Sequence, residues 1–428
     1  MITPDRTTAP AFKTIQHINV TRAKTHTLSN GIKVYSISAG SQEITKIEFV
    51  FRAGMYYQPA SLIASTTNTL LESGTRSYTA DELSDGIDFF GSFLELETGQ
   101  DFALLSLFSL NKYLEQSLHY MEEIIKWPTF QEDEFRIHIN NKKQKHLINS
   151  QKVNVLARRR FSELLFGPAH PYGLDVKEQD FERISVAELK HFFEKHYTAA
   201  NCSIFVSGHL PANVIETLDR FFGNNWQKDA TPVNEPEIEM VRFSNPKTFV
   251  SKDDAIQSAI RVGRLLFNKT HPDYFKFQVL NTILGGYFGS RLMANIREDK
   301  GYTYGIGSGI TNLVHSGYFF ISTEVGADVT NQTLNEIYKE LKLLREELVD
   351  ENELETVRNY ILGQFLRSVD GAFALADKYR AIWEYGLDYT YYDRYFNAVK
   401  TVTPNELRDL ANKYLREEDL LECVVGKM

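Results

Sequence analysis

Cysteine is nearly absent from this chain of 428 residues, which contains only Cys202 and Cys423. The two cysteines take equivalent places, each in an apolar stretch near the end of one half of the chain. Because two such residues do not make a disulfide framework, we expect two buried free thiols rather than a bridge. The pair does not identify the redox compartment.

Long apolar runs are also lacking, since no stretch of about 18 apolar residues occurs. Residues 1–24 are polar and contain no apolar signal core. We therefore expect no membrane span and a cytoplasmic location, or a periplasmic one if a leader has been removed. Positive charge is in deficit, because 47 Lys and Arg face 56 Asp and Glu. A net charge of −9 argues against a general nucleic-acid or anionic-membrane binder.

One stretch with helical periodicity occurs twice. In the first copy, 62–75, apolar residues recur with roughly a 3.6-residue period, Ser, Thr and Asn form a polar face, and Gly74 would end the helix. Much the same string returns at 279–286, about 213 residues later. Similar strings also end the two halves, at 205–208 and 423–426. The repetition predicts a tandem duplication.

Local signals between these landmarks predict alternating strands and helices. An Asn-Gly pair at 30–31 predicts a hairpin turn, and Thr79 with Glu82 predicts a capped helix start. We expect one long polar helical region at 131–160. The glycine-rich segment 285–289 is expected to be a flexible turn between two helices, because it lacks the Gly-Lys-Ser/Thr ending of a phosphate loop.

The predicted fold class is α+β, with two tandem homologous domains, each a largely antiparallel sheet with helices packed on one face. A Pro-containing stretch without periodicity, 224–246, is interpreted as a linker. The expected organisation is an N-terminal arm (1–23), a first domain (24–223), the linker and a second domain (247–428). The length suffices for two cores, since single cores rarely exceed about 250–300 residues.

A local basic face is predicted at 136–160, which contains no Asp or Glu. This composition fits a solvated or salt-bridged helix. It also fits the lining of a chamber that attracts acidic peptides or an acidic partner surface. Nucleic acid is disfavoured because few aromatic residues are interleaved here. The cations are Arg136, Lys142, Lys143, Lys145, Lys152, Arg158, Arg159 and Arg160.

Several short motifs follow one another along nearly the whole chain. They are Leu-Ser-Asn-Gly-Ile-Lys-Val (28–34), Phe-Arg-Ala-Gly (51–54), Gly-Thr (74–75), His-Pro-Tyr-Gly (170–173), Leu-Gly-Gly (284–286), Ser-Arg-Leu (290–292), Arg-Glu (297–298) and Gly-Tyr-Thr-Tyr-Gly (301–305). Together with the duplication, this order resembles the pitrilysin/insulinase family of zinc peptidases, in its short-chain branch with mitochondrial processing peptidase. The resemblance implies a LuxS/processing-peptidase-like metallohydrolase fold.

The resemblance also implies where a zinc site should be. Active members carry His-x-x-Glu-His on the first-half helix, where two His bind zinc, the Glu is the general base and a later Glu completes the ligands. Aligned on the Gly-Thr that follows the helix, these positions hold Ser65, Asn68 and Thr69, and the later Glu falls near Gln144 or Lys145. All four functional positions are therefore replaced.

The histidines of the chain offer no substitute for the missing motif. No His occurs between His26 and His119, so no shift of the alignment restores it. The eleven His also contain no pair four residues apart. A lone His is usually a surface or hydrogen-bonded core residue, and we expect no catalytic zinc in this chain.

The second half keeps a pair that the resemblance assigns to substrate binding, Arg297 and Tyr304. In the family, an Arg and a Tyr at this spacing reach an active site in the other half of the assembly, hold the substrate backbone and help to stabilise the oxyanion. Tyr302 is the alternative aromatic, because neighbouring strand residues point to opposite faces. A local ion pair for Arg297 and core packing for Tyr304 would be the purely structural interpretation.

The sequence therefore favours a non-catalytic, substrate-binding subunit of a heterodimeric peptidase that degrades or processes unfolded peptides. The partner subunit would carry the zinc, and this chain none. A structural or binding subunit without a role in proteolysis is the alternative, and a peptidase with an unrecognised site is a third. The isolated chain is expected to self-associate as a homodimer if no partner is present, and nucleic acid is not expected to bind.

Overall fold

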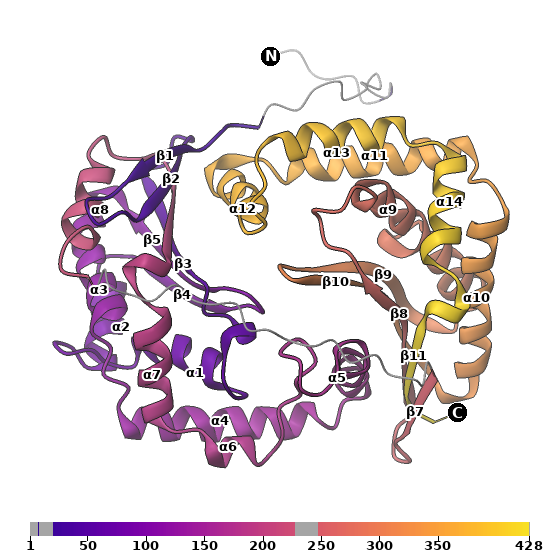
Figure 1. Cartoon of the computed structure of the whole chain (residues 1–428), viewed down its shortest axis with the longest axis horizontal. Helices are drawn as coiled ribbons and strands as arrows, with labels where there is room; N and C mark the ends of the chain where they lie inside the picture. The colour runs from indigo at the N-terminus through magenta and orange to yellow at the C-terminus, as the bar shows by residue number, and fades with distance from the viewer. Residues whose placement is uncertain (1–6, 8–19, 227–246, 428) are drawn as a thin grey trace.

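The computed structural model describes residues 7, 20–226 and 247–427. Most of the expected arm and most of the expected linker lie outside these residues. The chain forms two halves that face each other, each built from a sheet and its helices (Figure 1). Both halves combine strands and helices, as the predicted α+β class requires.

The first sheet has six strands: β1 (Lys24–Thr27), β2 (Lys33–Ser38), β3 (Ile44–Phe51), β4 (Phe93–Thr98), β5 (Ala103–Leu110) and β6 (Cys202–Gly208). They lie in the order β1-β2-β6-β3-β5-β4, and only β2 and β6 pair in parallel. The Asn-Gly pair makes the predicted turn between β1 and β2. Gly31 has a φ of 97°, a conformation in which a side chain would be strained.

The second sheet repeats this arrangement with five strands: β7 (Lys247–Ser251), β8 (Gln257–Leu266), β9 (Thr303–Leu313), β10 (Ser316–Gly326) and β11 (Leu421–Gly426). Their order is β7-β11-β8-β10-β9, and β7 and β11 form its parallel pair. Each strand of the second sheet thus corresponds to one strand of the first sheet, and only β1 of the first sheet has no counterpart among the described residues. Duplication of one ancestral unit would give this pattern.

The helices of the first half are α1 (Ile63–Thr69), α2 (Ala80–Phe89), α3 (Leu114–Lys126), α4 (Glu132–Asn149), α5 (Val153–Phe166), α6 (Asp180–Arg183), α7 (Val186–His196) and α8 (Val214–Phe222). Thr79 caps α2 together with Glu82, as predicted. The predicted long polar helical region at 131–160 is made of two helices, because the chain breaks between α4 and α5. The break lets α5 turn away and pack on the second sheet.

The helices of the second half are α9 (Tyr274–Asn281), α10 (Thr330–Glu346), α11 (Glu351–Arg367), α12 (Gly371–Trp383), α13 (Thr390–Thr401) and α14 (Pro404–Tyr414). Two π-helical segments, 282–286 and 293–299, follow α9. No helix within residues 7, 20–226 and 247–427 is both long and apolar enough to cross a membrane.

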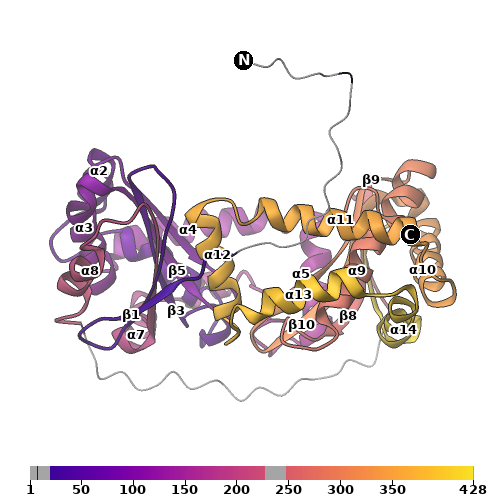
Figure 2. The same ribbon diagram turned by 90° about the horizontal axis from the view of Figure 1, so that it is seen from above.

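Each half gives one helix to the sheet of the other half. Figures 1 and 2 both place α5 beside the second sheet and α12 beside the first. Phe161 of α5 is buried in one cluster with Val425 of β11, and Leu375 of α12 is buried with Ile37 of β2. The sequence predicts helices on one face of each sheet, but it does not predict this exchange across the opposite faces.

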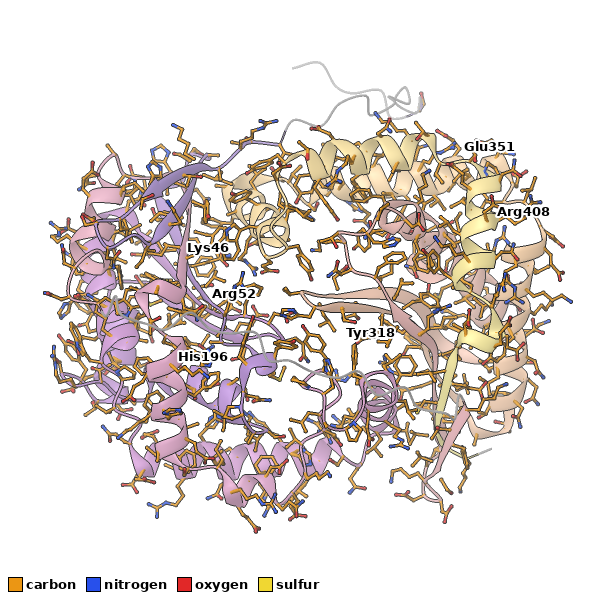
Figure 3. The ribbon with its side chains drawn as sticks, in the orientation of Figure 1. Lys46, Arg52, His196, Tyr318, Glu351 and Arg408 are labelled. Atoms are coloured by element: carbon orange, nitrogen blue, oxygen red, sulfur yellow. The ribbon has the colours of Figure 1, made fainter. Side chains whose placement is uncertain are left out.

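Buried charges also join the halves. Lys46 Nζ of β3 lies 3.1 Å from Glu48 Oε1 and 3.0 Å from Asp377 Oδ1 of α12. Arg380 Nε of α12 lies 3.7 Å from the same Glu48 oxygen. Figure 3 shows Lys46 on the side of the first sheet that faces α12. Because a buried charge without its partner is costly, this group fixes where α12 can dock.

The His-Pro-Tyr-Gly motif belongs to a second joint between the halves. The Tyr172 hydroxyl donates a hydrogen bond to Asp101 Oδ1, and the backbone N–H of Val314, in the turn between β9 and β10, donates to Asp101 Oδ2 at 3.1 Å. Burial raises the pKa of the Asp101 carboxyl, and these two hydrogen bonds oppose the shift. The Asp101 carboxylate therefore links the loop of Tyr172 in the first half to the turn of Val314 in the second.

The two cysteines are buried free thiols, as expected. Their positions differ from the expected equivalence in one respect. Cys202 opens β6, whereas Cys423 lies inside β11, so they occupy corresponding strands but not equivalent positions.

Candidate functional site

The helix that should carry the zinc motif, α1, is short and mostly buried. Ile63 and Ala64 pack into the first core, and a 3-10 turn at 70–72 ends the segment. Ser65 and Thr69 are half-buried, as residues of a site wall would be. Asn68, however, is fully buried, which corrects the expectation that it lies on an open polar face.

Asn68 fastens α1 to the sheet. Its Nδ2 donates to the carbonyl of Glu97 at 3.0 Å and that of Leu104 at 3.5 Å, and its Oδ1 accepts from the Tyr197 hydroxyl at 3.0 Å. Both its amide nitrogen and its amide oxygen are thus bonded to groups inside the protein. The amide can neither take up a proton nor approach a substrate, so the position of the family's general base now has a structural role.

The returning string in the second half repeats this arrangement. Asn281 Nδ2 donates to the Ser308 carbonyl of β9 at 3.4 Å, as Asn68 does to β4 and β5. Thr282 Oγ1 donates to the Gln278 carbonyl at 2.8 Å, and Thr69 Oγ1 donates to that of Ser65 at 2.9 Å. In both halves the Asn thus joins the helix to its sheet, while the Thr hydroxyl bonds within the helix.

Lys142 of α4 contacts the polar residues of α1, which we call the α1 wall, and this role was not identified from the sequence. The α1 wall consists of Ser65, Thr66, Asn68 and Thr69. Its Nζ donates to Ser65 Oγ at 2.7 Å and to Thr66 Oγ1 at 3.3 Å. Burial lowers the pKa of the Lys142 ammonium to about 8. The two α4 residues that the alignment marks, Gln144 and Lys145, are exposed instead.

His138 lies one helical turn before Lys142, on the same face of α4. The pKa of its imidazole is lowered to about 4, first by burial and then by the positive charges of Lys142 and Lys145. Its Nε2 is buried and has no hydrogen-bond partner among the described residues. The i, i+4 spacing of His138 and Lys142 could have marked this face from the sequence, although not its contact with α1.

The residues at this position do not fit zinc. Zinc in proteins takes thiolate, imidazole or carboxylate ligands, whereas the wall offers hydroxyls, an engaged amide and an ammonium. No group of three or more His, Cys, Asp or Glu side chains in the described part of the chain could hold a metal ion. The Lys142 ammonium would also repel a divalent cation.

Arg297 and Tyr304 lie together on the second half. The Arg297 guanidinium lies 4.6 Å from the Phe288 ring centroid and 5.8 Å from that of Tyr304. Tyr304 is 94% exposed and Phe288 64% exposed, while Tyr302 packs against the second core. Within the described residues, no carboxylate forms an ion pair with Arg297, so neither purely structural interpretation matches this arrangement.

Phe288 was not identified from the sequence, and the glycine-rich segment around it differs from expectation. Gly285 and Gly286 lie in the π-helical segment, and the turn comes after them. A Cβ on Gly285 would lie 2.6 Å from the backbone nitrogen of Ser308, so this glycine allows the helix to approach β9 closely. The turn then exposes Phe288 beside Arg297.

The basic stretch is partly neutralised. Lys143 pairs with Glu178 and Glu182 at 3.4 and 3.3 Å, Arg159 with Asp175 at 3.4 Å, Arg160 with Glu163 at 2.7 Å, and Arg136 with Asp133. These pairs match the salt-bridged interpretation. Lys142 differs, because its partners are hydroxyls and no carboxylate lies within ion-pair distance in the described part of the chain.

These observations define a class of protein: a two-unit, metallopeptidase-like fold in which the usual metal position lacks metal ligands. Comparisons with known proteins agree. Residues 183–361 match the family model described as the peptidase M16 inactive domain. An uncharacterized zinc protease of Bacillus subtilis is 21% identical over 81% of this chain and 84% of its own length. A non-peptidase homologue of Helicobacter pylori is 22% identical over 83% of this chain and 82% of its own.

A solved structure shares the fold. The crystal structure of a peptidase M16 inactive domain from Pseudomonas fluorescens matches with a TM-score of 0.83 at 23% identity, covering 95% of this chain and 99% of that one. The chain is thus similar to the M16 peptidases over these residues and shares their fold, and a protein named as a non-peptidase is among its relatives. The resemblance to zinc peptidases that have lost their motif is confirmed.

Proposed function

We propose that this chain is the zinc-free, substrate-binding subunit of a heterodimeric M16-type peptidase that acts on unfolded peptides. One contrast supports the proposal. The α1 wall offers no metal ligands, yet Arg297 and Tyr304 are displayed together without an ion pair in the described part of the chain. The partner would supply zinc and base, and this chain would supply the two donors.

The chemistry of the pair suits binding to a peptide backbone. A guanidinium keeps its charge at any physiological pH and presents a fork of donors, and a phenol adds one more. Packing on the Phe288 ring restricts the Arg297 side chain, so less freedom is lost when its donors engage a carbonyl or an oxyanion. The exposed ring of Tyr304 would be shielded from water if a ligand or partner covered it.

The peptide could bind at the free edges of the two sheets. The first sheet ends in β4 and the second in β9, and each has a strand partner on one side only within the described residues. An extended peptide can add to such an edge through backbone hydrogen bonds. Along β4, Phe93, Glu95 and Glu97 are exposed in alternation, and Tyr304 lies near the start of β9.

A titration tests the assembly. A zinc-bearing M16 subunit is held at fixed concentration, the purified chain is added, and the initial rate of peptide cleavage is followed by fluorescence. The proposal expects the rate to rise and to saturate at one chain per zinc subunit. A zinc subunit that is fully active alone, with a flat titration, would contradict it.

One alternative keeps specific support. A relative is named a non-peptidase homologue, and this name suits a structural or binding subunit of the same fold. Such a subunit would form the same dimer, detected by co-elution in size-exclusion chromatography, without changing the cleavage rate. The titration and the chromatography together separate the two functions.

A further inference from the structure

We propose that Lys142 turns the vacated metal position into a receptor for a peptide carboxylate. The proposal extends the peptide-binding function above to a second, separate site in the first half. A cationic centre is kept where the resemblance assigns zinc, but it is an ammonium held by hydroxyls. The ligand that suits such a centre is a carboxylate, at a peptide C-terminus or on an acidic side chain.

The hydrogen bonds of Lys142 support this inference. An ammonium has three N–H donors, and Ser65 Oγ and Thr66 Oγ1 accept two of them. Both acceptors are neutral, so the positive charge is oriented by hydrogen bonds but not neutralised. Its neighbour in sequence, Lys143, has two carboxylates within ion-pair distance, whereas Lys142 has none in the described part of the chain.

The groups around Lys142 favour an anion. The α1 helix contributes no ionisable side chain, and the titratable groups coupled to this face are His138 and Lys145 of α4 itself. His138 is neutral at physiological pH and has a buried nitrogen without a partner among the described residues. A carboxylate at Lys142 would neutralise the unpaired positive charge. The acidic residues of α4 lie in its first turn, two turns or more before Lys142, and β4 contributes Glu95 and Glu97 along its own edge.

The position can be reached and lies beside a docking edge. Ser65 and Lys142 are half-buried rather than sealed. Asn68, on the same short helix as Ser65, is bonded to the backbone of β4. A peptide added along β4 would therefore pass close to the α1 wall, with its carboxylate in reach of the ammonium.

The test measures binding of fluorescent peptides to the isolated full chain. Three versions of one sequence are compared: a free C-terminal acid, the C-terminal amide, and the amide with one internal Asp. We expect the acid to bind about tenfold more tightly than the amide, because only the acid can form a charge-assisted hydrogen bond with the ammonium. The internal-Asp version shows whether a side-chain carboxylate serves equally well.

Substitutions assign the preference to one residue. Lys142→Met should abolish the difference between acid and amide, while Lys142→Arg should retain part of it. Lys145→Met is the matched control on the same helix and should leave the preference intact. Wild-type protein gives a readout that needs no variant: the preference should decline as pH rises above about 8, where the ammonium loses its proton.

Three results would overturn the receptor: equal binding of acid and amide, no binding of either peptide, or a preference that survives Lys142→Met. The outcome is separable from that of the proposed peptidase role, because no partner is present in the binding assay. A flat titration with the zinc subunit would end the peptidase role without affecting this site.

Discussion

Asn68 shows, at the scale of one residue, how a catalytic position becomes a structural one. The family motif places a general base there, and this chain has an amide bonded to two strands and to Tyr197. The sequence could predict the loss of the metal ligands, because residue types alone decide it. The new role was not predictable, since the three partners of Asn68 lie far away in sequence and only the fold brings them close.

This anchoring role can be tested by an isosteric change. Asn68→Asp replaces a donor with an oxygen that faces the carbonyls of Glu97 and Leu104, and we expect a loss of about 2–4 kcal/mol in the free energy of unfolding. Asn281→Asp is the matched control. It should cost less, because Asn281 is only half-buried and its bond to Ser308 is longer.

The pH dependence of that variant has a defined sign. Burial and the facing carbonyls would raise the pKa of the new carboxyl in the folded state above its unfolded value. The folded state then binds more protons than the unfolded one, so stability falls as pH rises through this interval. Urea denaturation should show a larger penalty at pH 8 than at pH 5, and an equal penalty at both would argue against a buried carboxylate.

At the scale of the element, local sequence patterns predicted several turns, caps and helices. They did not predict against which sheet each helix packs. The hairpin at 30–31 and the capping box of α2 follow from turn and cap chemistry. The break between α4 and α5 does not, because α5 packs on strands of the second sheet that are distant in sequence, and only the fold brings them to it. The contact between Lys142 and α1 could not be predicted for the same reason.

The exchanged helix α5 gives a prediction about stability. Phe161 is fully buried between α5 and the second sheet, so Phe161→Ala should lower the free energy of unfolding by about 3–5 kcal/mol. Phe89→Ala is the control of equal chemistry, because Phe89 is 81% exposed and should change stability little. Equal effects of the two substitutions in urea denaturation would contradict the exchange.

The whole molecule couples its halves through the two exchanged helices, the charges around Lys46 and the joint at Asp101. This coupling has a functional consequence. The α1 wall and the Arg297–Tyr304 pair are held on one framework, which in the proposed complex would present both to a partner and a peptide at once. In the proposed complex the two sites have different tasks, carboxylate capture at Lys142 and donation across the dimer at Arg297.

The most direct measurement is the cleavage rate of the zinc-bearing subunit in complex with Arg297→Ala of this chain, at saturating concentration. We predict a fall of about 10²–10³ in kcat, the usual cost of one lost oxyanion donor, with a smaller loss for Tyr304→Phe. Lys300→Ala, an exposed cation on the same segment, should have no effect. If the complex still forms and Arg297→Ala leaves the cleavage rate unchanged, the proposed role of Arg297 is contradicted.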